Sequence, residues 1–114
     1  MIIAIHAIIY SKHADKMREF LGDVLELPSV EAGEGWPIYA APPTELAVHP
    51  TEGEPEHELY LVCDDINKTI AKLAERGIKA EAVADRGWGL VTTLELPGGE
   101  RMGLYEPKHP SPLR

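Results

Sequence analysis

The chain has 114 residues, enough for one domain with its own hydrophobic core, and its 19 acidic and 11 basic side chains give a net charge of −8. No basic patch is present to bind a nucleic acid backbone, and no apolar stretch approaches the roughly 20 residues of a membrane span. The single cysteine excludes an internal disulfide, and only a short apolar run stands between Met1 and the polar residues Ser11, Lys12 and His13, so we expect a cytoplasmic protein.

The first residues predict a strand followed by a helix. Residues 2–10 alternate as a half-buried strand does, with His6 and Tyr10 on the face opposite the core. Over residues 12–25 apolar side chains recur at helical spacing, and Ser11 is suited to cap this helix because its hydroxyl can accept from an early backbone N–H.

Three short extended pieces and a linker follow this helix. The pieces lie near Val30, at 36–40 and at 44–49, and they are separated by glycines and prolines. Residues 51–56 have too little apolar content to be anything but a linker.

The same order of elements then begins again. Residues 57–63 alternate as a strand, and Asp64 or Asp65 caps a helix that Gly77 ends. Further extended pieces are predicted at 78–83, 87–96 and 101–105, with a Pro97-Gly98-Gly99 turn between the last two.

Two landmarks support an internal repeat. Gly35-Trp36 recurs as Gly87-Trp88, and His6 corresponds to Glu58, so both pairs share an offset of 52 residues (88 − 36 and 58 − 6). We therefore predict a single domain made of module one (1–50), the linker, module two (57–107) and a tail (108–114).

Four stretches of the chain resemble the vicinal oxygen chelate superfamily, which contains glyoxalase I, bleomycin and fosfomycin resistance proteins and extradiol dioxygenases. These stretches are HAIIYSKHADKMREFLGDVLELPSV, ELAVHP, ELYLVCDDINKTIAKLAERGI and TTLELPGGERMGLYEP. The resemblance implies an α+β fold in which two tandem βαβββ modules form a curled mixed sheet cup with helices on the outer face. It also implies a homodimer.

The resemblance further names four positions for a metal site on the cup floor. The first-strand positions fall on His6 and Glu58, whose imidazole and carboxylate suit iron, nickel, zinc or manganese. The last-strand positions fall on Ala47 and Gly103, which have no ligand atoms. Two ligands are too few for a tight site, since catalytic metals usually have three protein ligands.

Two other interpretations of this site stay open. A register different by one pleat adds His49 and gives a His6, His49, Glu58 set of the kind that binds non-heme iron. Alternatively, His6 and Glu58 form a metal-free acid–base pair, or simply line a groove.

Aromatic side chains are the candidates for ligand contacts. Tyr10, Tyr60 and Tyr105 are expected on the cup face, as ligand walls or as ordinary filler of the sheet face. Trp36 and Trp88 follow glycines at repeat-equivalent positions, where packing at the rim and stacking on a ligand are both open.

The other histidines, the cysteine and the paired glycines do not indicate a further site. His13, His57 and His109 are expected to be exposed, and Cys63 is expected to face the helices as a small hydrophobe. Gly98-Gly99 is a turn and not a loop that cradles phosphate.

The sequence therefore predicts a protein that binds a small oxygenated or aromatic molecule in the cup. It acts on this molecule as a dioxygenase or a glyoxalase-type lyase or isomerase, through a divalent metal or through acid–base chemistry, or it sequesters a drug without metal or catalysis.

Overall fold

The computed structural model describes residues 6–33, 35–45, 47–54 and 56–113. The first half of the chain contains a helix, a π-helical turn and an antiparallel hairpin: α1 (Ala14–Glu19), η1 (Phe20–Val24), β1 (Ser29–Glu31) and β2 (Pro37–Tyr39). The helix predicted over 12–25 is confirmed in its central part. The prediction that Ser11 caps it is wrong: the N-cap is His13, and the Ser11 hydroxyl accepts from the N–H of His13 before the first turn, because the helix begins only at Ala14. The Tyr39 hydroxyl donates to the carbonyl oxygen of Arg18 over 3.3 Å, which ties the hairpin to the helix.

Two predicted strands of the first half are absent from the described residues. Residues 6–10 are exposed and outside any strand, while residues 2–5 of the same prediction lie outside the described residues. Residues 44, 45 and 47–49 are also irregular, and Leu46 is not described. The alternation of side chains predicts which face is apolar, but a strand also needs a neighbour for its backbone hydrogen bonds.

The second half forms a five-stranded mixed sheet with one long helix. Its elements are β3 (Tyr60–Val62), α2 (Ile66–Glu75), β4 (Lys79–Ala80), β5 (Ala84–Asp85), β6 (Gly89–Glu95) and β7 (Arg101–Pro107). The strand order is β3-β7-β6-β4, with β5 also paired to β6; β3 runs parallel to β7, and the other pairs are antiparallel. The predicted strand, helix and three strands of residues 57–107 are thus present, with the two-residue β5 in addition.

Helix α2 has a well-defined start and end. The Asp65 carboxylate accepts from the N–H of Lys68 over 3.0 Å, and the Glu106 carboxylate from β7 accepts from the N–H of Ile66 over 3.0 Å. At the other end Gly77 has a φ of 80°, a conformation that only glycine adopts without steric cost. Both predicted boundaries are confirmed, and Glu106 joins the helix directly to the sheet.

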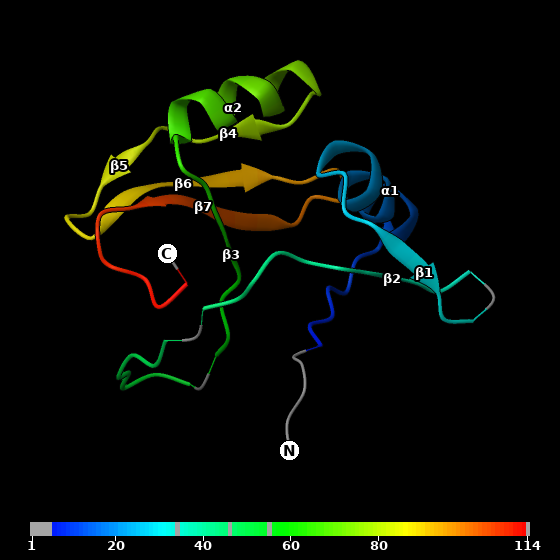
Figure 1. Ribbon diagram of the computed structural model, residues 1–114, viewed down its shortest axis with the longest axis horizontal. Helices are drawn as coiled ribbons and strands as arrows, with labels where there is room; N and C mark the ends of the chain where they lie inside the picture. The colour runs from blue at the N-terminus through cyan, green and yellow to red at the C-terminus, as the bar shows by residue number, and fades with distance from the viewer. Residues whose placement is uncertain (1–5, 34, 46, 55, 114) are drawn as a thin grey trace.

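The helices cover one face of the sheet and leave the other face open. The core on the covered face consists of Met17, Phe20, Ile66, Leu73, Ile78, Leu94, Leu96, Met102 and Leu104. In Figure 1, α2 lies along the top of the sheet and α1 lies beyond the right-hand ends of β6 and β7. Within the described residues, no helix is long and apolar enough to cross a lipid bilayer.

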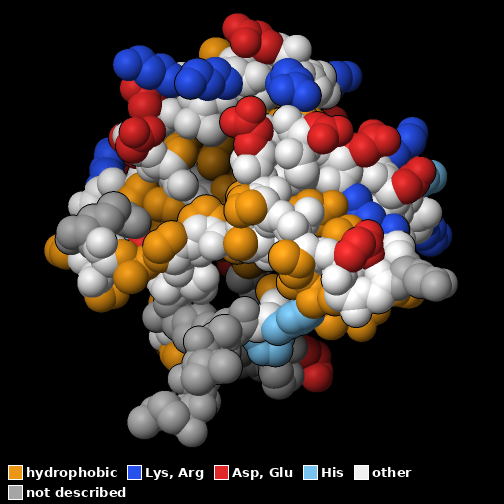
Figure 2. Space-filling model, turned by 45° about the vertical axis from the view of Figure 1, so that its right-hand side comes forward, with side chains coloured by type: hydrophobic (Ala, Val, Ile, Leu, Met, Phe, Trp, Pro, Cys, Tyr) orange, Lys and Arg blue, Asp and Glu red, His pale blue; other side chains and the backbone are white. Residues whose placement is uncertain are grey.

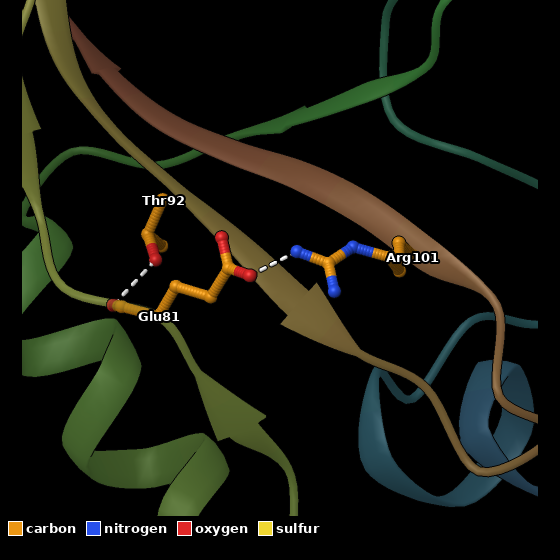
Figure 3. Close-up of polar contacts among 3 residues, drawn as sticks. All are labelled: Glu81, Thr92 and Arg101. Atoms are coloured by element: carbon orange, nitrogen blue, oxygen red, sulfur yellow. Dashed lines mark hydrogen bonds and ion pairs between the residues drawn. The ribbon is translucent and has the colours of Figure 1, made fainter.

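The turn after β4 is fixed by a buried hydroxyl. The Thr92 side chain, only 3% exposed, donates to the carbonyl oxygen of Glu81 over 2.7 Å (Figure 3). The Glu81 carboxylate forms an ion pair with Arg101 of β7, as the same view shows. These contacts join the middle of β6 and the start of β7 to the segment between β4 and β5.

Candidate ligand-binding face

The candidate site lies on the open face of β3, β7 and β6. Successive side chains of a strand point to opposite faces, so Met102 and Leu104 enter the core while Gly103 and Tyr105 face the other way. The sheet register places Tyr60 beside Gly103 and Val62 beside Tyr105. Tyr60 and Tyr105 thus lie on the face of the sheet opposite Met102 and Leu104, while Leu59, also predicted to face the core, is exposed.

Four rings gather on this face, and we call them the aromatic cluster: Tyr60, Trp88, Tyr105 and His109. Tyr105 is at its centre, with ring centroids 5.6 Å from Tyr60, 5.3 Å from Trp88 and 5.9 Å from His109. The tyrosine and tryptophan pairs are edge-to-face, at interplanar angles of 86° and 76°, which is a favourable arrangement for aromatic rings. Tyr60 is 38% exposed and Trp88 45% exposed, so the cluster presents aromatic surface to solvent.

Gly103 makes room for the Tyr60 ring. A Cβ atom at this position would overlap the ring of Tyr60, because the ring lies directly against the glycine backbone. The last-strand position at which the resemblance places a metal ligand is therefore covered by an aromatic ring. Any longer side chain there would have to displace it.

Glu58 lies at the Tyr60 end of the aromatic cluster. Burial raises the pKa of the Tyr60 phenol, and a hydrogen bond with the Glu58 side chain and the negative charge of Glu58 raise it further, while the charge of Arg86 lowers it. The phenol therefore stays protonated, and its hydroxyl donates a hydrogen bond to the carboxylate. Glu58 itself is exposed, just before β3.

A pocket of about 320 Å³ opens where β3 and β7 end, lined by Val62, Cys63, Asp64, Glu106 and Pro107. This volume is within the range of small-molecule sites. No ring of the aromatic cluster lines this pocket.

The remaining predicted site residues lie elsewhere. His6, Tyr10 and His49 are exposed in irregular segments, with Tyr10 86% exposed. Trp36 precedes β2 and packs under the Arg18 guanidinium, whose central carbon lies 5.5 Å from the ring centroid. The structure thus brings together Tyr60, Trp88 and Tyr105, with Glu58 beside them, and places Trp36 against α1.

No group of three or more His, Cys, Asp or Glu side chains suited to hold a metal ion occurs in the part of the chain that the structure describes. His6, His49 and Glu58 all belong to that part, and they do not assemble into such a group.

Cys63 faces the helix side, as predicted, and is half-buried. Its thiol lies 3.6 Å from the carbonyl oxygen of Tyr105. Burial raises the pKa of this thiol, so the reactive thiolate is disfavoured.

His109 is the residue of the aromatic cluster that the sequence argument missed. It was expected to be exposed in the tail, whereas it is half-buried with its Nε2 atom 3.3 Å from the Tyr105 hydroxyl. The nearby prolines, Pro107 and Pro110, indicate that the chain leaves the strand and turns here. They do not indicate toward which face of the sheet it turns.

A scan against protein-family models and a search of curated proteins give no match for this chain. Among solved structures it is similar to TnmS3, an antibiotic binding protein from Streptomyces sp. CB03234, with a TM-score of 0.65 and 21% identity over 93% of this chain and 99% of that one. SMU.1112c is similar with a TM-score of 0.59 and 21% identity over 93% of this chain and 100% of that one. A lactoylglutathione lyase from Agrobacterium tumefaciens is similar with a TM-score of 0.63 and 14% identity over 90% of this chain and 92% of that one.

Each of these likenesses extends over at least nine tenths of both chains. At such low identities they establish a fold and leave the activity to be argued from the site. The chain has the α+β fold of these solved structures, in agreement with the predicted fold class.

Proposed function

We propose that this protein binds a small planar molecule, aromatic or oxygenated, on the open sheet face, and that it does so as a binding protein without a metal. The aromatic cluster carries this proposal. Tyr60, Trp88 and Tyr105 come from three different segments, and the ring centroids of Tyr60 and Trp88 each lie less than 6 Å from that of Tyr105.

The exposure of these rings supplies the driving force. A planar ligand that covers the exposed parts of Tyr60 and Trp88 removes apolar surface from water at both partners. Strand pairing and edge-to-face contacts already hold the rings in place, so little side-chain freedom is lost on binding.

Two further observations favour binding over metal-dependent chemistry. The Tyr60 ring lies over Gly103, where a metal ligand would be expected from the resemblance. In addition, the solved structures to which this chain is similar include one described as an antibiotic binding protein. The other activity named among them, that of lactoylglutathione lyase, belongs to a protein of 14% identity.

Calorimetric titration with a planar aromatic probe, 2-naphthol, tests the proposal. We expect Trp88→Ala to weaken binding about tenfold, because one ring of the cluster is lost. Trp36→Ala is the matched control, since it removes the chain's other tryptophan from a place beside α1, and it should leave the affinity unchanged. Equal affinities of all three proteins would contradict the proposal.

Elemental analysis distinguishes the metal-dependent alternative. The protein is incubated with iron, nickel, zinc or manganese and desalted, and we expect the bound metal to stay far below one equivalent, because two ligands are too few for a tight site. Near-stoichiometric metal that disappears in both His6→Ala and Glu58→Ala would replace the proposal with glyoxalase- or dioxygenase-type chemistry. Loss in His49→Ala as well would identify the third ligand.

A further inference from the structure

The C-terminal tail is held against the loop that carries Trp88. The backbone N–H of Lys108 donates to the carbonyl oxygen of Trp88 over 2.8 Å, and its ammonium group lies 2.8 Å from the carboxylate of Asp85. The other oxygen of Asp85 accepts from the N–H of Gly87 over 2.9 Å. In Figure 1 the tail turns back below β7, on the side away from α2. These contacts fix the tail where it leaves β7 and bring His109 to the open face.

The hydrogen bonds of His109 determine which ring nitrogen carries the proton. The Nδ1 atom lies 2.7 Å from the carbonyl oxygen of Pro110. A carbonyl oxygen only accepts, so Nδ1 must be the donor. In the neutral imidazole the other nitrogen, Nε2, is then an acceptor, and it accepts from the Tyr105 hydroxyl over 3.3 Å.

We propose that His109 is a specificity-determining residue of the ligand site and that Nε2 selects planar ligands with a hydrogen-bond donor at the ring edge, phenols above all. This inference rests on the proposed function, since it concerns the same face.

The geometry of the Tyr105 contact supports an exchange of partners at Nε2. An O–H donor commonly lies 2.5–3.0 Å from its acceptor, so a contact of 3.3 Å is long and weak. A ligand hydroxyl that approaches Nε2 can therefore replace the Tyr105 hydroxyl at small cost. Its ring would lie against Trp88 and Tyr105, whose own contact is 5.3 Å between centroids.

A matched pair of probes tests the inference: 2-naphthol and 2-methoxynaphthalene, which share the planar ring and differ in the donor. Calorimetry on the full chain should give about fivefold tighter binding of the naphthol, the worth of one neutral hydrogen bond. His109→Phe keeps a ring but removes the acceptor, and it should bring the naphthol down to the affinity of the ether. His109→Gln keeps an acceptor oxygen and should retain part of the preference.

His13→Phe is the control, because it makes the same chemical change at the start of α1 and should leave both affinities alone. If the wild-type protein binds both probes equally, or if His109→Phe weakens both by the same factor, the selectivity of His109 is disproved while the binding function stands. If the wild-type protein binds neither probe, both proposals are overturned.

Discussion

At the scale of single residues, the open face depends on a position without a side chain. Gly103 lies in the middle of β7, where a glycine usually weakens a strand. A glycine is needed here because the Tyr60 ring packs directly on its backbone. The sequence comparison identified Gly103 as a missing metal ligand. In the structure the same glycine leaves the space that the Tyr60 ring of the aromatic cluster occupies.

Gly103→Ala should therefore disturb both stability and ligand binding. The added methyl group overlaps the Tyr60 ring, so the ring must move, and we expect a loss of about 1–3 kcal/mol in the free energy of unfolding. Urea denaturation measures the stability, and titration with 2-naphthol measures the accompanying loss of affinity.

Gly53→Ala is the comparison for this substitution. An added Cβ at Gly53 meets only the Thr51 hydroxyl, at 3.5 Å, which is ordinary contact. If Gly103→Ala and Gly53→Ala have the same free energy of unfolding and the same affinity for 2-naphthol, the Tyr60 ring does not pack on Gly103.

At the scale of elements, α2 is held to the sheet by charge as well as by packing. Asp65 and Glu106 each accept from a backbone N–H group in the first turn of α2. Such N–H groups have no hydrogen-bond partner within the helix. Ile66 and Leu73 on the inner side are buried in the core. The start of α2 is thus fixed by two carboxylates, that of the adjacent Asp65 and that of Glu106 in β7.

Asp65→Ala should cost about 1 kcal/mol in the free energy of unfolding, the usual value of an N-cap carboxylate. The measurement is again urea denaturation followed by circular dichroism. Asp64→Ala removes the neighbouring carboxylate, which is exposed and is not the cap, and its effect should be within about 0.5 kcal/mol. If both variants lose the same stability, the cap at Asp65 contributes nothing of its own.

At the scale of the whole molecule, much apolar surface is left uncovered. Val48 is 97% exposed, and Ile8, Val30 and Leu59 are also exposed. On the face drawn in Figure 2, charged side chains crowd the top, where α2 lies, while hydrophobic side chains gather across the middle. Among the described residues no strand pairs with the outer edge of β3, and such an edge is a ready template for another strand.

We propose, from the sequence resemblance and from this exposed apolar surface, that the protein forms a homodimer. Sedimentation equilibrium should give a mass of about 25 kDa, twice the 12.6 kDa of one chain. Leu59→Lys, next to the β3 edge, should shift the mass toward that of one chain. Val83→Lys places the same charge on an exposed residue between β4 and β5 and should leave the dimer intact. A mass of one chain at every concentration would contradict the dimer.

The sequence by itself determined the elements whose signals are local. Residues 14–24 and 66–75 are helical because apolar side chains recur at helical spacing. Asp65 and Gly77 bound the second helix because these two caps depend on adjacent residues. Alternation likewise predicted that Tyr60 and Tyr105 share the face opposite Leu61 and Leu104. These inferences use contacts a few residues apart along the chain.

The tertiary structure alone decided which strands find neighbours and which side chains meet. Residues 6–10 and 47–49 alternate well enough to predict strands, yet pairing requires a second strand at the correct edge, which no local pattern encodes. His109 reaches Tyr105 because Lys108 binds Trp88 and Asp85, which lie 20 and 23 residues earlier in the chain. The candidate site depends on such long-range contacts, and for that reason the sequence named three of its four rings but not the residue that completes it.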